Sequence, residues 1–167
     1  GGSVRAERAR AGMRGGTSGG VMPDIVRRAQ WLCARSWPDL QGKVCPGVRA
    51  LLSRLERRGV VTGLVTGNLT RIAWKKMDHA GLRPYFRFGA FAGQARDRSG
   101  LARMAIREAR RQKWIGPGSP ISLIGDHPND VNAARANGAR SIAVATGVIS
   151  LEELQSHSPD ILLADLR

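Results

Sequence analysis

Short apolar segments alternate with stripes of apolar residues at helical spacing through most of this chain. Val48, Leu51, Leu52 and Leu55 fall at positions i, i+3, i+4 and i+7, which is one face of a helix. The expected helices are 21–36, 48–58, 69–80, 101–114, 129–137 and one beginning after Ser150; the expected strands are 60–66, 86–91, 121–125, 141–145 and 161–163. Strands that alternate with helices form a parallel sheet covered on both faces. The sequence therefore predicts an α/β fold with a Rossmann-like parallel sheet and flanking helices.

Residues 1–20 differ in composition from the rest of the chain. They are rich in Gly, Arg, Ala and Ser and contain almost no large apolar residues. Such a segment cannot bury enough surface to offset the entropy of ordering, so we expect residues 1–20 to be a disordered basic segment.

Length and cysteine content narrow the class of protein. A chain of 167 residues with 42% hydrophobic residues is expected to form one globular domain. No apolar run approaches the roughly 20 residues of a membrane span, and the N-terminus lacks the apolar stretch of a signal peptide. Cys33 and Cys45 match no metal or redox spacing. We expect free thiols in a reducing compartment, the cytoplasm.

The formal net charge of +14 favours anionic partners. Residues 49–114 hold 16 of the 27 Lys and Arg residues, whereas residues 115–167 hold 3. The basic residues are scattered over expected helix faces, and no aromatic residues interleave with them along the sequence as in a base-stacking surface. The pattern favours solvated helix faces over a nucleic-acid footprint, which stays open as an alternative.

Two carboxylates follow the expected strand 121–125. Asp126 comes directly after Gly125, and Asp130 follows one helical turn later. Ligands of doubly wound sheets bind beyond the carboxyl ends of the strands, and paired carboxylates suit a hard cation such as Mg²⁺. The alternative is that Asp126 and Asp130 only cap the following helix.

A second polar cluster ends the expected strand 60–66. Thr66-Gly67-Asn68 offers a hydroxyl and backbone N–H groups before a helix, which suits a phosphate. The alternative is an ordinary glycine turn with Asn68 as the N-cap.

The order of these motifs resembles the core of a haloacid dehalogenase-like (HAD) hydrolase, of the phosphoglycolate-phosphatase-like kind. The resemblance covers Val44 to Arg167 and rests on the following segments: Cys45-Pro-Gly-Val-Arg-Ala-Leu-Leu, Leu64-Val-Thr-Gly-Asn, His79-Ala-Gly-Leu, Tyr85-Phe-Arg-Phe-Gly-Ala-Phe, Ile124-Gly-Asp-His-Pro-Asn-Asp, Ala145-Thr-Gly-Val-Ile-Ser-Leu-Glu-Glu-Leu and Pro159-Asp-Ile-Leu-Leu. It implies a core at residues 44–167, with residues 21–43 as a remnant of a helical cap region.

The resemblance also implies roles for individual residues. Thr66 would bind the transferred phosphoryl group, Asp126 would be a Mg²⁺ ligand and Asp130 its neighbour. Arg98 is the preferred basic residue of the site, and Lys76 is the other candidate. The implied activity is Mg²⁺-dependent hydrolysis of small phosphorylated metabolites.

The sequence departs from this family in one respect. The family's nucleophile lies in an Asp-x-Asp-Gly-Thr loop that follows its first strand, and these 167 residues contain no such loop. Asp24 and Asp39 are the only aspartates before Asp78, and neither follows an apolar strand. Asp24 resembles an N-cap. We assign neither residue a catalytic role, and we expect this chain alone to be inactive.

The family's first strand lies in the middle of the sheet, between the strands that match 60–66 and 121–125. Without it, two inner strands would face each other with unpaired N–H and C=O groups, which favours self-association. Three explanations stay open: an incomplete sequence, a sheet that closes in another way, or a gene remnant. A non-catalytic phosphate-binding module and a basic nucleic-acid-binding protein are the alternative functions.

Overall fold

The structure is a computed structural model, and it describes residues 40–167. Its elements are, in chain order, η1 (Gln41–Lys43), α2 (Val48–Arg57), β1 (Gly63–Val65), α3 (Thr70–His79), η2 (Arg83–Tyr85), β2 (Phe88–Ala90), α4 (Arg98–Arg111), β3 (Ser122–Gly125), α5 (Pro128–Ala136), β4 (Arg140–Val144), α6 (Leu151–Ser156) and β5 (Ile161–Leu163). The expected disordered segment 1–20, the expected helix 21–36, most of the cap region 21–43, and Asp24, Cys33 and Asp39 lie outside the described residues.

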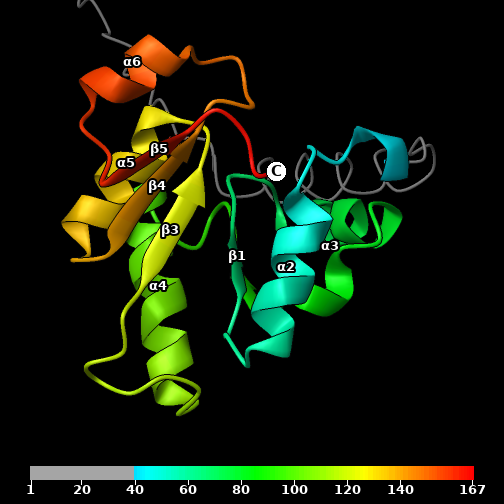
Figure 1. The fold of residues 1–167 in the computed structure, drawn as a ribbon. Helices are drawn as coiled ribbons and strands as arrows, with labels where there is room; N and C mark the ends of the chain where they lie inside the picture. The colour runs from blue at the N-terminus through cyan, green and yellow to red at the C-terminus, as the bar shows by residue number, and fades with distance from the viewer. Residues whose placement is uncertain (1–39) are drawn as a thin grey trace, which may run out of the picture.

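The strands form two parallel sheets (Figure 1). In the first sheet β1 pairs with β2, and Leu64 lies opposite Gly89. In the second sheet the order is β3-β4-β5, and Ile142 lies between Ile124 and Ile161. The predicted α/β class with parallel strands is confirmed.

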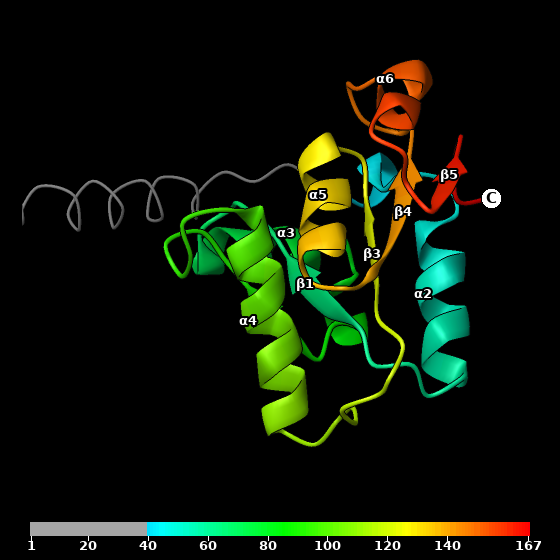
Figure 2. The same ribbon diagram turned by 90° about the vertical axis from the view of Figure 1, so that its left-hand side faces the viewer.

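Helices flank the strands on both sides. Figure 2 shows α4 and α5 on one side of the strands and α2 on the other. The buried core of residues 40–167 divides into three clusters, centred on Leu52 between α2 and η2, on Ala105 between α4 and the first sheet, and on Leu154 between α6 and the second sheet. Packing of α4 against α5 joins the halves that carry the two sheets.

Helix ends follow the sequence signals. Gly59, Gly81 and Gly138 have φ values of 67°, 63° and 62°, a left-handed conformation that glycine adopts at helix C-termini. Asp97 accepts a hydrogen bond from the Gly100 N–H at 2.7 Å and starts α4 three residues earlier than the apolar stripe predicted. This earlier start places Arg98 on the first turn of α4.

The facing edges of β1 and β3 are unpaired within residues 40–167. The two strands lie side by side in Figures 1 and 2, yet they belong to different sheets. Ile124 in β3 is 45% exposed, so the prediction of a buried strand at 121–125 was wrong for this residue. The expected strands 60–66 and 86–91 also form only over 63–65 and 88–90. A strand that is paired on one side only lacks the second set of ladder hydrogen bonds and the second neighbouring strand. The missing hydrogen bonds explain the short strands, and the missing neighbour explains the exposure of Ile124.

One face of the second sheet is only partly covered by the described residues. Ile124, Ile142 and Ile161 are in register and therefore share a face, and Ile161 is 37% exposed. The opposite face is packed, with Ala143 and Val131 of α5 buried against each other. In residues 40–167 no helix has the length and apolar character needed to cross a membrane.

Candidate phosphate and metal site

The loop after β1 is held by hydrogen bonds between side chains. The Asn68 side-chain amide donates to the Thr66 hydroxyl oxygen at 2.9 Å, and the Asn68 backbone N–H donates to the same oxygen at 3.2 Å. The Lys76 ammonium of α3 donates to the Asn68 side-chain oxygen at 3.1 Å. The first residue before α3, in the N-cap position, is Leu69, so the alternative that Asn68 caps this helix was wrong.

These bonds fix the orientation of the Thr66 hydroxyl. A hydroxyl has one proton to donate and two lone pairs that accept. Because Asn68 occupies the lone pairs with two donors, the proton of Thr66 points elsewhere and remains a donor. A donor at the carboxyl end of a strand is the group that a phosphate oxygen needs.

Asp126 and Asp130 lie at the carboxyl end of β3, each against a glycine. A Cβ atom at Gly125 would collide with the Asp130 carboxylate, and one at Gly147 would collide with the Asp126 carboxylate. The N-cap of α5 is His127, whose Nδ1 accepts from the Asn129 N–H at 3.1 Å. The alternative that the aspartates serve as N-caps was therefore wrong, and both carboxylates face glycine-lined space.

Arg98 connects the two sheets. One guanidinium nitrogen donates to the carbonyl oxygen of Val65 in β1 at 3.0 Å, and another lies 3.1 Å from a carboxylate oxygen of Asp130 in α5. The Arg98 and Asp130 side chains are 29% and 17% exposed. The Thr62 carbonyl accepts from the Arg87 N–H just before β2, and the Thr66 N–H donates to Ala90 of β2, so the backbone groups of Val65 point to the open edge of β1. Arg98 thus occupies one backbone acceptor that a further strand could use.

The pKa of the Asp130 carboxyl lies above its ordinary value. Burial is the main cause, because it disfavours the charged form, and the negative charge of Asp126 adds to it. The positive charge of Arg98 opposes this shift. Asp126 is therefore close enough to Asp130 to disfavour the charged form of its carboxyl group.

The donor set fits part of a Mg²⁺ site. Carboxylate oxygens are the ligands that Mg²⁺ prefers, and Mg²⁺ requires octahedral coordination. Asp126 and Asp130 supply two carboxylates, one of which is paired with Arg98. No group of three or more His, Cys, Asp or Glu residues in the described part of the chain is arranged to hold a metal ion. These residues would therefore hold Mg²⁺ only together with water and additional ligands.

The site residues form two groups with one link between them. Thr66, Gly67, Asn68 and Lys76 gather after β1, and Asp126 and Asp130 gather after β3. Arg98 is the link, through Val65 in the first group and Asp130 in the second. Lys76 contacts Asn68 in the first group, on α3, whereas Arg98 reaches the acidic group.

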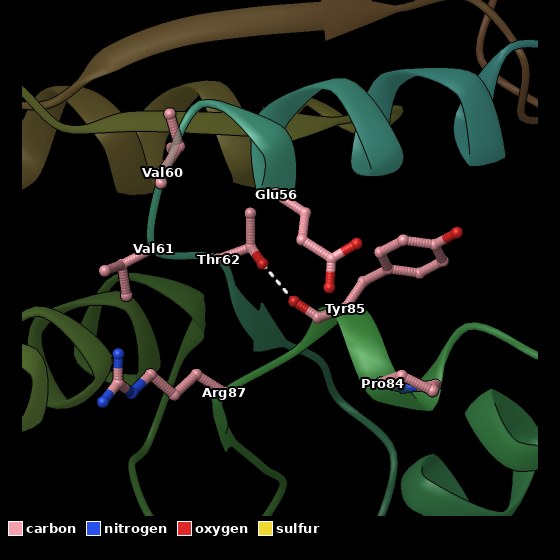
Figure 3. Close-up of a pocket in the computed structure, with 8 residues that line it drawn as sticks. Glu56, Val60, Val61, Thr62, Pro84, Tyr85 and Arg87 are labelled. Atoms are coloured by element: carbon pink, nitrogen blue, oxygen red, sulfur yellow. Dashed lines mark hydrogen bonds between the residues drawn. The ribbon is translucent and has the colours of Figure 1, made fainter.

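A pocket of about 350 Å³ lies elsewhere (Figure 3). Its lining includes Val60, Val61 and Thr62, which precede β1, together with Glu56 of α2 and residues around Tyr85. The Thr62 hydroxyl donates to the Tyr85 carbonyl at one side of it. Because Thr66 follows the opposite end of β1, this pocket is separate from the candidate site.

Comparison with known families decides the membership of the chain. A family model described as haloacid dehalogenase-like hydrolase matches residues 23–138. The chain belongs to the haloacid dehalogenase-like hydrolases. This family membership agrees with the α/β fold and its parallel strands.

Curated members of this hydrolase family are similar to the chain over most of its length. The phosphoglycolate phosphatase of Synechococcus elongatus is 28% identical over 151 residues, which cover 90% of this chain and 68% of the relative. The phosphoglycolate phosphatase of Pseudomonas fluorescens is 27% identical over 124 residues, which cover 74% of this chain and 45% of the relative. In the first relatives matched, the aligned region covers 45–57% of the relative's own length, so this chain spans about half the length of these proteins.

A solved structure is also similar to this chain. The crystal structure of a predicted phosphatase from Clostridium acetobutylicum is 28% identical, with a TM-score of 0.60, over 71% of this chain and 54% of that chain. The two chains share the arrangement of strands and helices over the part that is aligned.

Sequence reasoning missed the roles of two residues at the site. The phosphate-binding role of Asn68 stays a prediction, and the sequence did not indicate that its side chain bonds Thr66 and Lys76. Gly147 has no role in the sequence-based site, although its missing side chain makes room for Asp126. The signal for Gly147 was the Thr146-Gly147 pair directly after an apolar strand, the same pattern as Thr66-Gly67.

Proposed function

We propose that this chain carries the phosphate-binding and metal-binding parts of a Mg²⁺-dependent phosphomonoester hydrolase. The proposed substrates are small phosphorylated metabolites, and phosphoglycolate is the first to test because the curated relatives carry that name. The observation that supports this most is Arg98, which links the loop after β1 to Asp130 after β3. A phosphate held by Thr66 would thereby lie near the guanidinium group of Arg98 and near Asp126 and Asp130, which would hold Mg²⁺.

Each group has a chemical task in this proposal. The Thr66 hydroxyl and the N–H group of Gly67 would donate to phosphoryl oxygens, and Asn68 would orient the Thr66 hydroxyl through its own N–H groups. Arg98 would offset negative charge on the phosphoryl group. Asp126 and Asp130 would hold Mg²⁺, which supplies further charge neutralisation when bound. Lys76 would hold Asn68 in place, because its ammonium group donates to the Asn68 side chain.

We also propose that this chain alone has no turnover. Phosphoryl transfer in this family begins with an aspartate, and the 167 residues contain no Asp-x-Asp-Gly-Thr loop. We further propose a cytoplasmic location, because Cys45 is an exposed free thiol. Self-association through the facing edges of β1 and β3 is expected, because no strand within residues 40–167 pairs with those edges.

A second candidate is a phosphate-binding module without chemistry. It is supported by the ion pair between Arg98 and Asp130, which engages one of the two carboxylates that Mg²⁺ would need. Calorimetric titration with Mg²⁺ separates the two, because the first candidate predicts weak Mg²⁺ binding and the second predicts none, whereas titration with inorganic phosphate tests both. Thr66→Ala is expected to abolish phosphate binding, and the control Thr70→Ala, on the exposed start of α3, is expected to leave it unchanged. Phosphate binding that survives Thr66→Ala contradicts both candidates.

A further inference from the structure

The solvent-facing side of α4 consists of arginines. Leu101, Ala102, Ala105 and Ala109 face the core and are buried. Arg103, Arg107, Arg110 and Arg111 lie on the opposite side of the same helix and are exposed. At 1.5 Å per residue, Arg103 to Arg110 covers about 10 Å of helix axis. We call Arg103, Arg107 and Arg110 the arginine face.

Most of this positive charge is not neutralised by neighbouring side chains. Glu108 is the only acidic residue of α4, and both of its carboxylate oxygens accept from Arg111, at 2.7 and 2.8 Å. Arg110 donates to the Pro117 carbonyl at 3.3 Å. Within residues 40–167, no acidic side chain forms an ion pair with Arg103 or Arg107.

An arginine stacked on a tryptophan lies past the end of α4. Trp114 follows the helix, and its backbone N–H donates to the Ala109 carbonyl at 3.0 Å. The guanidinium of the exposed Arg87 lies 4.5 Å from the centre of the Trp114 ring, and the Phe88 ring lies 5.3 Å from it. Aromatic residues do not interleave with basic ones along the sequence, but the fold brings them together here. Arginine planes and aromatic rings are the surfaces on which unpaired bases stack.

Charge is also distributed unevenly between the two halves of the described chain. Residues 40–114 contain 17 Lys and Arg against 4 Asp and Glu, whereas residues 115–167 contain 3 against 6. The field of the molecule therefore directs a polyanion toward the half that holds α2, α3 and α4.

We propose that the arginine face, with Arg87 at its end, binds the phosphodiester backbone of single-stranded nucleic acid. Arginine pairs with phosphate oxygens in a bidentate geometry, and three guanidinium groups within about 10 Å of helix axis suit consecutive phosphates. A lipid surface fits less well, because the apolar side of α4 is buried in the core and the exposed side offers nothing to insert. Binding at the arginine face does not depend on the proposed phosphatase site.

The experiment measures binding of a fluorescently labelled 20-nucleotide poly-dT strand and its RNA counterpart by anisotropy, from 50 to 300 mM salt. The test variant is the triple Arg103→Gln, Arg107→Gln, Arg110→Gln. The control is the triple Arg54→Gln, Arg57→Gln, Arg58→Gln, which removes the same charge from exposed positions at the end of α2. Helices α2 and α4 lie on opposite sides of the strands (Figure 2). Glutamine keeps the helix propensity of arginine, and far-UV circular dichroism checks that both variants fold alike.

Each phosphate of a single strand that the protein neutralises adds about 0.7 to the magnitude of the slope of log K against log salt. We expect the test variant, which removes three arginines, to reduce this magnitude by about 2 and to bind at least tenfold more weakly at 100 mM salt. The control is expected to keep the slope and to bind less than threefold more weakly. Equal reductions in the two variants would show attraction by net charge alone and would overturn the proposal. So would absence of binding at 50 mM salt, or binding to phosphatidylserine vesicles or polyglutamate but not to the oligonucleotides.

Discussion

Supplying a central strand as a separate peptide is expected to convert this chain into a cooperative fold. The peptide, called the donor peptide below, combines an apolar strand with an Asp-x-Asp-Gly-Thr loop. It would lie between β1 and β3, whose facing edges are unpaired in the described residues. Without the peptide, we expect a loosely packed state that keeps its helical far-UV signal, binds a hydrophobic dye and lacks a sharp melt.

The magnitude follows from the groups on the two edges. Gly63 and Val65 on β1, and Ser122 and Ile124 on β3, point their N–H and C=O groups away from their paired neighbours. Arg98 already bonds the Val65 carbonyl. The remaining groups, at about 1 kcal/mol for each hydrogen bond made, contribute on the order of 7 kcal/mol. Typical domains are stable by only about 5–15 kcal/mol, so this loss is decisive.

The net free energy of binding of the donor peptide is smaller than the summed hydrogen-bond contribution, because ordering each backbone residue of the peptide costs about 1–2 kcal/mol. The net affinity therefore depends on burial of the peptide's apolar side chains. At a concentration 100 times its Kd, the peptide is expected to stabilise the chain by about 2.7 kcal/mol. Once bound peptide has made the fold cooperative, a further gain of this size corresponds to a rise in Tm of about 10 °C for a chain of this size.

The assay is thermal unfolding followed by circular dichroism and dye fluorescence, with increasing donor peptide. The control peptide has the same length and the same loop but carries proline at alternate strand positions, where it cannot donate to the ladder. A chain that is monomeric, melts sharply by itself and gains nothing from the donor peptide would refute the reasoning. Such a result would mean that the edges of β1 and β3 are paired by residues outside 40–167.

Three further predictions concern single side chains. Mg²⁺ binding by the chain alone is expected to be weak, with a Kd of about 1 mM or above, and to be lost in Asp126→Asn; micromolar affinity in calorimetry that survives this change would contradict the metal assignment. The pKa of Asp130 is raised, so the contribution of its protonated form to stability is present below about pH 4 and is lost as the pH rises through the folded pKa. Asp130→Asn is therefore expected to be more stable than the natural chain between about pH 4 and 7, which melts with the donor peptide measure. Arg98→Met is expected to raise the Asp130 pKa further, which NMR titration of the carboxyl group measures. The backbone N–H and hydroxyl of Ser141 lower the pKa of Asp160, so Asp160→Asn is expected to destabilise the chain at pH 7. The destabilisation is expected to shrink as the pH falls from the ordinary Asp pKa of about 3.9 through the lowered folded pKa, because the natural chain loses the contribution over that range; destabilisation that stays constant throughout would count against this prediction.

The sequence predicted the parts of the fold that depend on local signals. Gly59, Gly81 and Gly138 have positive φ values, and their positions could be predicted because glycine is the residue that adopts this conformation at helix C-termini. The order of strands and helices follows from apolar periodicity, which depends on neighbours three or four residues away. The first residue of α4 was misplaced because Asp97 extends the helix beyond its apolar stripe.

The parts that could not be predicted depend on contacts between distant segments. Nothing in the run Ile121–Gly125 shows that Ile124 would be exposed, because its exposure depends on which strands are its neighbours. The bond from Lys76 to Asn68 joins residues on an expected helix and an expected loop, and it changes the interpretation of both side chains. The pairing of Arg98 with Asp130 also required the packing of α4 against α5.

Hydrolysis of p-nitrophenyl phosphate in the presence of Mg²⁺ tests the central claim most directly. The chain is assayed alone, with the donor peptide, and with a donor peptide whose first aspartate is asparagine; Thr66→Ala and Asp126→Asn chains are the controls. We predict no turnover by the chain alone, measurable turnover with the donor peptide, and loss of that turnover in the asparagine peptide and in both variants. Turnover by the chain alone that is lost in Thr66→Ala would contradict the account, because it would require a nucleophile within these 167 residues.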